Sequence, residues 1–349
     1  MAIERLELVN FRNFISRELT FSHKNILLTG PNGSGKTNVL ESIAFLSLLR
    51  SFRTTTPREL IRIGTKGFHL AATLALPCGK EKLTVNETIS GRRELFIGDA
   101  PVRRSSEFIR EFHAVIFSPE DRAIADGSSG HRRKYFDILI STVEPEYLTR
   151  LSCYNRALLQ RNKALKTAPH LAAAFEAELI AHAPALAVRR RHYAALVEQS
   201  VQLLLRDRGS CRIIYHTDTP DTPEEYHRAF IQKRESELRR ACTLIGPQLD
   251  EFEIFFNDKP LRSFGSTGQI RLITLLLKLA QFQLIKQQST APVITLADDV
   301  TGELDPQNLE LFLSTIATAD QGFFTFADTP KADLPDSLTI RTDTWQREG

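Results

Sequence analysis

Residues 25–37 read NILLTGPNGSGKT, a short apolar run that ends in glycine and leads into a glycine-rich loop. Such a run is typical of a buried strand, and residues 36–49, KTNVLESIAFLSLL, repeat apolar side chains at helical spacing. The loop matches the pattern G-x-x-x-x-G-K-[ST] between that strand and that helix, which is the context that the pattern needs. The stretch therefore predicts a phosphate-binding loop in an α/β fold.

Glycine, lysine and threonine give this loop its expected chemistry. Its glycines let backbone amides approach phosphate closely, and the start of the helix adds unpaired N–H donors. Lys36 is expected to reach the β- and γ-phosphates of a nucleotide, and the Thr37 hydroxyl to ligate Mg²⁺. The predicted nucleotide-binding residues are Gly30, Pro31, Asn32, Gly33, Ser34, Gly35, Lys36, Thr37 and Asn38.

A second apolar run, VITLADD at 293–299, ends in two carboxylates. Asp298 is placed to bind Mg²⁺ directly or through water, and Asp299 to position an attacking water. Together with Lys36 they form the predicted catalytic set. The alternative is an acidic strand end that caps the next helix, where Asp305 and Pro306 have the residue types of an N-cap and a first helical position.

The stretch FGSTGQIR at 264–271 is a second glycine-containing turn before a predicted helix that runs to about residue 286. One interpretation is an ordinary capped helix, with Ser266 or Thr267 satisfying an amide. The other is a loop that touches a nucleotide held by another copy of the chain. The Lys36 loop already supplies a full set of donors to one nucleotide, so a further helix start at Ser266, Gly268 and Gln269 is redundant unless it meets a phosphate from outside.

The spacing of apolar residues divides the 349-residue chain into two domains. Residues 1–121 and 249–349 mix strands and helices, with ELFIGDAPV at 94–102 expected to form a strand, whereas residues 122–248 have helical periodicity without a sustained heptad. The N-terminus lacks the layout of a signal peptide, and no apolar run approaches the roughly 20 residues of a membrane span. Four scattered cysteines fit a reducing cytoplasm.

Basic side chains are concentrated in two segments. Residues 50–110 contain 12 Lys/Arg and 6 Asp/Glu, and residues 131–212 contain 14 and 7, although the whole chain carries only +3. This segregation suits a polyanionic partner such as nucleic acid, and solvated helix faces are the alternative. The clusters expected to contact DNA are Arg132, Arg133 and Lys134, and Arg189, Arg190 and Arg191; RNKALK at 161–166 is a further basic cluster.

Taken together, the motifs resemble the RecF family of DNA-repair ATPases, relatives of ABC transporter and SMC ATPase heads. The resemblance rests on LVNFRNF at 8–14, TGPNGSGKTNVLESIAFLSLLRSFRT at 29–54, FSPEDRAIADGSSGHRRKYFD at 117–137 and YNRALLQRNKALK at 154–166, together with FGSTGQIR and ADDVTGELD. It implies an ABC-type P-loop ATPase head with a mixed sheet, an antiparallel strand lobe and an inserted helical domain, without a long coiled coil.

The resemblance also implies a function. Two subunits would sandwich ATP and Mg²⁺, with Ser266, Gly268 and Gln269 acting in trans and Asp305 as the D-loop residue. Arg12 matches an arginine that leans over the nucleotide, and Arg53 is expected nearby. The family binds duplex DNA beside single-stranded gaps, works with RecR and RecO in replication, repair and the SOS response, and helps RecA replace single-strand-binding protein. Slow, DNA-stimulated ATP hydrolysis would act as the release step.

Three departures from ABC ATPases accompany the resemblance. Asp299 stands where those proteins have glutamate, SPED at 118–121 replaces the Q-loop glutamine, and no histidine follows the strand GFFTFADT, where Thr325 or Asp328 could substitute. Two other classes of protein fit the sequence less well. The missing glutamine and histidine argue against a transporter subunit, and an ATPase-coupled nuclease would need a carboxylate-rich metal domain after the last strand.

Overall fold

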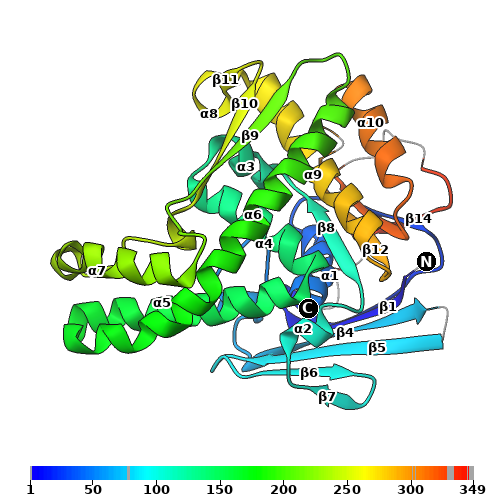
Figure 1. Cartoon of the computed structure of the whole chain (residues 1–349). Coiled ribbons are helices and arrows are strands. Elements are labelled where there is room, and N and C mark those ends of the chain that lie inside the picture. Colours follow the sequence, from blue (N-terminus) through cyan, green and yellow to red (C-terminus); the bar gives the residue numbers. More distant parts are fainter. Residues whose placement is uncertain are drawn as a thin grey trace. The chain divides into compact units, whose positions relative to one another are not determined.

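The computed structural model describes residues 2–76, 79–300, 302, 304–327, 334–343 and 345. By its internal contacts the chain forms two compact units (Figure 1). The first, unit 1, comprises Met1–Asp121 and Gln281–Gly349, and the second, unit 2, comprises Arg122–Ala280. Asp328, one of the two residues considered as a histidine substitute, lies outside the described residues.

Unit 1 contains a parallel sheet with the strand order β14-β3-β13-β12-β8. Its strands are β3 (Asn25–Thr29), β8 (His113–Phe117), β12 (Val293–Asp298), β13 (Gln321–Phe326) and β14 (Ser337–Arg341). β8 and β13 are buried at every position, as expected for parallel strands covered on both faces. The helices of this unit are α1 (Lys36–Leu48), α2 (Ser105–Phe108), α10 (Pro306–Ile316) and the end of α9 (Thr267–Gln288).

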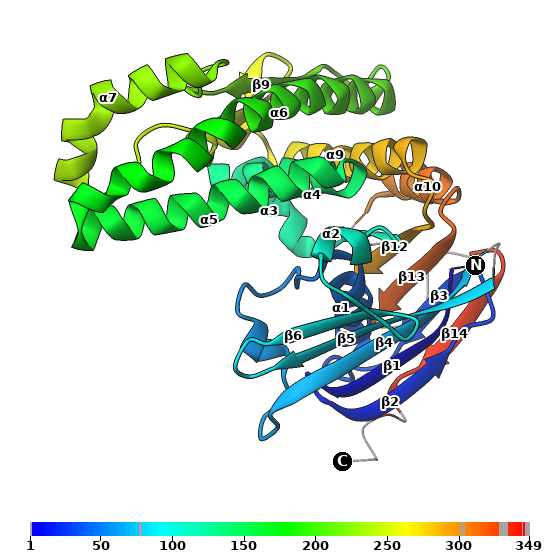
Figure 2. The same ribbon diagram turned by 60° about the horizontal axis from the view of Figure 1, so that its bottom comes forward.

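The second sheet of unit 1 is antiparallel, with the order β2-β1-β4-β5-β6-β7 (Figure 2). Its strands are β1 (Ile3–Phe11), β2 (Phe14–Thr20), β4 (Gly67–Leu76), β5 (Gly79–Thr88), β6 (Arg93–Ile97) and β7 (Ala100–Val102). The single strand predicted over 94–102 is therefore wrong. Ile97 pairs with Ala100 across a two-residue turn, and Gly98 in that turn has φ +58°, a conformation that glycine adopts without strain.

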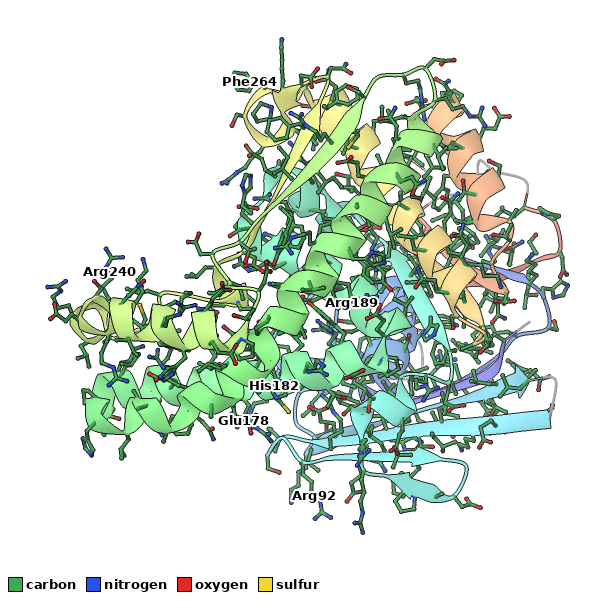
Figure 3. All side chains as sticks on the ribbon, in the orientation of Figure 1. Arg92, Glu178, His182, Arg189, Arg240 and Phe264 are labelled. Atoms are coloured by element: carbon green, nitrogen blue, oxygen red, sulfur yellow. The ribbon has the colours of Figure 1, made fainter. Side chains whose placement is uncertain are left out.

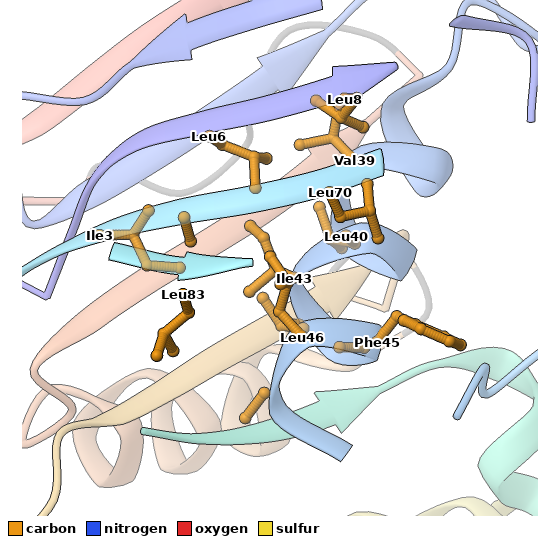
Figure 4. Packing of buried hydrophobic residues seen from close by; sticks show 14 of the residues in the cluster. Ile3, Leu6, Leu8, Val39, Leu40, Ile43, Phe45, Leu46, Leu70 and Leu83 are labelled. Carbon is orange, nitrogen blue, oxygen red and sulfur yellow. The ribbon is translucent and has the colours of Figure 1, made fainter. Parts of the chain in front are cut away.

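The core of unit 1 lies between the two sheets and is built around α1. Val39, Leu40 and Ile43 of α1 are fully buried and pack with Leu6 of β1 and Leu70 of β4 (Figure 4). α1 also contacts β8, β12 and β13 of the parallel sheet. Because α1 is packed on both faces, its first turn, which follows the glycine-rich loop, is held in a fixed position.

Unit 2 is mainly helical. Its helices are α3 (Arg122–Asp126), α4 (Ser129–Val143), α5 (Pro145–Thr167), α6 (Glu176–Leu205), α7 (Pro223–Arg240), α8 (Leu261–Phe264) and the start of α9. A small sheet joins β9 (Cys211–His216), β10 (Glu251–Phe256) and β11 (Lys259–Pro260) in the order β11-β10-β9. Short 3-10 helices are η1 (Pro57–Leu60) and η2 (Pro119–Asp121) in unit 1, and η3 (Pro169–Phe175) and η4 (Pro247–Leu249) in unit 2.

The second domain boundary differs from the one expected from sequence. β10 was grouped with the ATPase domain beginning at residue 249, but it pairs along its whole length with β9, which lies in the helical segment. The compact unit therefore extends to Ala280. The first boundary, between residues 121 and 122, is the same for the predicted domains and for the compact units. The predicted division of function at residue 249 stays a prediction.

Among the described residues, one helical stretch, Pro169–Leu205, is long and apolar enough to cross a membrane by length and composition alone. The sequence had predicted no run of this length. One helix of this kind is weak evidence, because core helices of soluble proteins pass the same test. Here α6 packs against α4, α5 and α7 within unit 2, and 39% of the most apolar window of the stretch is buried.

Candidate functional site

The carboxyl ends of four parallel strands meet at an open cavity of about 380 Å³ in unit 1. The loop after β3, the turn after β8 and the ends of β12 and β13 all reach it, which is where open α/β sheets bind ligands. The lining residues are Asn32, Gly33, Gly35, Lys36, Thr37, Asn38, Arg53, Pro119, Glu120, Asp298, Asp299, Thr325 and Ala327. The structure thus brings the two predicted motifs together.

The glycine-rich loop places Lys36 as the first residue of α1, with its side chain folded over the loop. Its Nζ donates to the carbonyl oxygens of Gly30 (2.5 Å) and Pro31 (2.9 Å). Burial lowers the pKa of Lys36, which is only 8% exposed, while the Asp299 and Asp298 carboxylates act in the opposite direction. An anionic ligand in the cavity would therefore stabilise the charged form of Lys36.

Close backbone approach explains the glycine before this lysine. Gly35 has φ +104°, and a Cβ there would lie 2.7 Å from Phe14 Cζ. No side chain caps α1, so its first amides are available to a ligand. Ser34, in contrast, is buried and its hydroxyl lies 2.5 Å from Thr342 Oγ1, so its side chain supports the loop from behind.

The predicted Mg²⁺ ligands lie next to each other. Thr37 Oγ1 donates to Asp298 Oδ1 at 2.8 Å, although the two residues are 261 positions apart, and Thr325 Oγ1 donates to the same oxygen at 2.8 Å. Hydroxyl and carboxylate oxygens are the hard ligands that Mg²⁺ prefers, so this pair fits the ion. Burial raises the pKa of Asp298, and the hydrogen bonds from Thr325 and Thr37 offset part of that rise.

Asp299 follows β12 in a left-handed conformation with φ +54°. Its backbone N–H donates to Thr325 Oγ1 at 3.0 Å, and its exposed carboxylate belongs to the cavity lining. The backbone of Asp299 is therefore fixed by the neighbouring strand, while its side chain can reach a water in the cavity. Thr325 contacts both predicted catalytic aspartates, and its role as a substitute for the missing histidine stays a prediction.

The buried charge of Asp298 yields a stability prediction. The folded protein holds a proton at this carboxyl more tightly than the unfolded chain, so its contribution to stability is lost as pH rises from the ordinary pKa through the raised folded one. We expect Asp298→Asn, which keeps an acceptor for Thr37 and Thr325, to raise the Tm at neutral pH by about 2 °C. The same change should weaken Mg²⁺-dependent nucleotide binding. Differential scanning fluorimetry of the protein without nucleotide or metal measures the first effect.

Asp320→Asn is the matched control because its expected sign is opposite. Burial acts to raise the pKa of Asp320, but the hydrogen bond from Lys286 Nζ (2.6 Å) and the Val293 N–H together leave it lowered. Removing this charge should lower the Tm. A fall in Tm for Asp298→Asn would contradict the prediction.

Pro119, Glu120 and Ala327 line the cavity but were not among the residues predicted for the site. Pro119 and Glu120 lie in the SPED turn, which follows β8, the neighbour of β12 in the parallel sheet. Arg53, which the resemblance placed near the nucleotide, also lines the cavity. In the described part of the chain Arg12 is not among the lining residues, and its guanidinium instead donates to Glu41 and to the Glu59 carbonyl.

The second glycine-containing turn forms a reciprocal cap in unit 2. Ser266 N donates to Gln269 Oε1 at 2.9 Å, and Gln269 N donates to Ser266 Oγ at 3.3 Å, which is a capping box at the start of α9. The adjacent Gly268 is exposed, and so is the side chain of Phe264 (Figure 3). Asp305 is likewise the N-cap of α10, as the alternative reading expected, and accepts from Asn308 N at 2.9 Å.

The basic clusters of unit 2 require a correction. Arg132 is 4% exposed and donates to both carboxylate oxygens of Glu251, and Arg190 is 2% exposed and binds Asp137 and Asp250. Their guanidinium groups are buried and paired, so the expectation that they contact DNA is wrong. Arg161 in RNKALK is also buried and paired with two glutamates.

The other four basic residues are more accessible. Lys134 and Arg191 are exposed, and Arg191 lies 3.4 Å from Asp221. Arg133 is half-buried and donates to the Asp250 carbonyl, and Arg189 on α6 pairs with Glu144 (Figure 3). The sequence clusters thus split into side chains that hold unit 2 together and side chains that face solvent.

Known proteins resemble this chain over most of its length. A family profile described as the RecF/RecN/SMC N terminal domain matches residues 2–330. The DNA replication and repair protein RecF of Cyanothece sp. is 33% identical over 93% of this chain and 91% of its own length. The protein of the same name from Lacticaseibacillus casei is 34% identical, covering 93% of this chain and 92% of the relative.

Solved structures confirm the predicted fold class. The structure of the recombination mediator protein RecF-ATP in the RecFOR pathway matches with a TM-score of 0.89 and 25% identity, covering 98% of this chain and 96% of that one. An Smc head domain derived from Pyrococcus furiosus matches with a TM-score of 0.50 and 17% identity, covering 94% and 90%. The fold is that of an ABC-type ATPase head, and the longest helix in its described part, α6, has 30 residues.

Proposed function

Because the chain belongs to the RecF family of DNA replication and repair proteins, we propose that it is an ATP-dependent DNA-binding protein of recombinational repair. It works in the cytoplasm, binds duplex DNA beside single-stranded gaps, and helps to load RecA together with RecO and RecR. The matched structure of the recombination mediator protein RecF-ATP in the RecFOR pathway supports this assignment.

One observation carries the proposal: the cavity unites Lys36 and Thr37 with Asp298 and Asp299 from the far end of the chain. Bound ATP would supply the phosphoanhydride bond, and Mg²⁺ would neutralise part of the charge of its phosphates. Lys36 would then turn from the loop carbonyls to the phosphates, Thr37 and Asp298 would hold the metal, and Asp299 would orient water. The Asp299 side chain is one methylene shorter than that of glutamate, and this shorter reach supports slow ATP hydrolysis. We propose that DNA stimulates this hydrolysis.

We further propose that ATP acts as a switch for a homodimer. In the single chain two donors at the α9 start, Ser266 N and Gln269 N, are occupied by the reciprocal cap, and Ser266 and Gly268 are exposed. A phosphate held by Lys36 of another copy would take over these donors, with Gly268 allowing close approach. Asp305 would then act as the D-loop residue across the interface. ATP drives dimerisation in this scheme because it binds the dimer better than the monomer.

Sedimentation velocity with ATP and Mg²⁺, with ADP, and without nucleotide tests the switch. We expect Asp299→Asn to dimerise with ATP, and Ser266→Arg to stay monomeric while it still binds ATP, because the larger charged side chain fills the phosphate approach. Ser314→Arg, the same change at an exposed position of α10, is the control and should dimerise. Normal dimerisation of Ser266→Arg, or no ATP-dependent dimer of any variant, would exclude the sandwich.

The surface that faces DNA is proposed from the accessible basic residues Arg133, Lys134, Arg189 and Arg191. Phosphate contacts by such side chains position a protein without reading sequence. We propose that residues 122–248 serve this role, while residues 1–121 and 249–349 handle the nucleotide. A transporter subunit is not proposed, because the relatives described above are DNA replication and repair proteins.

A further inference from the structure

A buried carboxylate, Glu41, lies in α1 one turn after the phosphate-binding loop. Its side chain is 0% exposed, and its two oxygens accept from Arg12 Nη2 (2.7 Å) and Arg12 Nε (2.8 Å). A buried carboxylate is costly unless it is paired and hydrogen-bonded. Arg12 provides that pairing, and its Nη1 donates to the Glu59 carbonyl oxygen at 2.8 Å. The guanidinium of Arg12 thus neutralises the carboxylate of Glu41.

The same carboxylate fixes the loop that follows α1. Ser51 Oγ donates to Glu41 Oε1 at 2.5 Å, and this hydroxyl accepts from the backbone N–H groups of Arg53 (2.9 Å) and Thr54 (3.1 Å). Ser51 is itself buried. Two consecutive amides of the loop are therefore tied through a single hydroxyl to a residue of the phosphate-binding helix.

Arg53 is the side chain that this loop delivers to the cavity. Its Nη1 donates to Asn38 Oδ1 at 3.0 Å and lies 3.5 Å from Glu41 Oε2, and its side chain is 39% exposed and lines the cavity beside Lys36 and Thr37. Both contacts use Nη1. An arginine has five N–H donors, so its Nε and Nη2 can serve a ligand.

The charges around Glu41 favour an anionic ligand. One carboxylate faces two guanidinium groups, and Arg12 takes both of its oxygens at short range. The longer contact of Arg53 leaves most of its charge uncompensated within this cluster. That charge reaches the cavity, because Arg53 acts to lower the pKa of Asp298.

We propose that Glu41 is a positioning residue that holds Arg53 at the cavity, where Arg53 contacts the phosphates of the bound nucleotide. This inference rests on the proposed function, because it assumes that the cavity takes ATP. The resemblance already implies that Arg53 lies near the nucleotide; the new element is that Glu41 holds it there, while Arg12 pairs with Glu41 instead of facing the cavity. The bidentate geometry of arginine suits phosphate oxygens.

The test is isothermal titration calorimetry of the full chain with ATPγS and Mg²⁺. We expect Arg53→Ala to weaken binding about tenfold, the effect of one hydrogen bond to a charged group. Arg53→Lys should recover part of this loss because it keeps the charge. Arg58→Ala, which removes an exposed arginine outside the cavity lining, should bind as wild type does.

A double-mutant cycle separates positioning from general stability. Glu41→Gln should weaken binding in the wild-type background and have little further effect once Arg53 is alanine, because contacting residues are not additive. Ser51→Ala, which breaks the link to the loop without uncovering a charge, should behave in the same way and serves if Glu41→Gln does not fold. Equal factors in both backgrounds would overturn the positioning role.

Lys36→Ala distinguishes failure of this inference from failure of the proposed function. If Lys36→Ala binds ATPγS as tightly as wild type, the cavity is not the nucleotide site and both fail. If Lys36→Ala loses binding but Arg53→Ala binds normally, the nucleotide site stands and the role of Arg53 is overturned.

Discussion

Arg190→Ala is expected to lower the free energy of unfolding by about 3–5 kcal/mol, the cost of removing one partner from a buried ion pair. Arg190 Nη1 donates to Asp250 Oδ2 at 2.7 Å, and its Nη2 donates to Asp137 Oδ1 at 2.9 Å. Without the guanidinium, two carboxylates inside unit 2 lose their counter-charge. Tyr215 and Thr217, which also donate to Asp250, cannot replace a full positive charge. Urea unfolding followed by far-UV circular dichroism measures the loss, since unit 2 is mainly helical.

Arg191→Ala is the matched control for this prediction. Arg191 is the next residue of α6, but it is exposed and lies 3.4 Å from an exposed partner, Asp221. Its loss should change the free energy of unfolding by less than about 1 kcal/mol, as for surface ion pairs. Similar losses for the two variants would show that the network around Arg190 does not stabilise unit 2. Arg191→Ala also tests the proposed DNA surface without the complication of unfolding.

These arginines show what a sequence pattern can and cannot reveal. Consecutive helical residues point about 100° apart, so the run at 189–191 must place its members on different faces of α6. Helical periodicity alone does not say which one points inward. That depends on Asp137 and Asp250, which are 53 and 60 residues away from Arg190 and become neighbours only through tertiary packing. The basic character of the segment was visible in the sequence, and its burial was not.

The nucleotide site likewise contains residues that the sequence could predict and residues that it could not. Lys36 and Thr37 were predictable because a local strand–loop–helix pattern defines them, and Asp298 because it ends an apolar strand. Glu120 enters the cavity only because β8 lies next to β12 in the sheet, an order that the sequence does not state. The compact helical unit extends beyond residue 249 for a related reason, since the partner of β10 is β9, some forty residues earlier in the chain, rather than an adjacent segment.

Asp299→Asn is expected to slow ATP hydrolysis at least about a hundredfold, the usual contribution of a positioned proton acceptor. The carboxylate would lose its charge, while Lys36, Thr37 and Asp298 would still hold ATP and Mg²⁺. Asparagine suits the backbone at this position, because Asp299 has φ +54° and asparagine tolerates the left-handed region. The hydrogen bond from its N–H to Thr325 Oγ1 should persist. Phosphate release at saturating ATP and Mg²⁺, with and without gapped DNA, measures the effect.

Two further variants separate the effect of the Asp299 charge from the effects of side-chain length and of the left-handed backbone conformation. Asp258→Asn makes the same change at another left-handed aspartate, φ +59°, on an exposed turn of unit 2, and should leave hydrolysis unchanged. Asp299→Glu restores the carboxylate on a side chain one methylene longer and should raise hydrolysis if reach limits the rate. An unchanged or lower rate for Asp299→Glu would show that reach is not the limit. Hydrolysis by Asp299→Asn within a few-fold of wild type would remove Asp299 from the catalytic set, because water positioning would then have to come from another residue of the cavity.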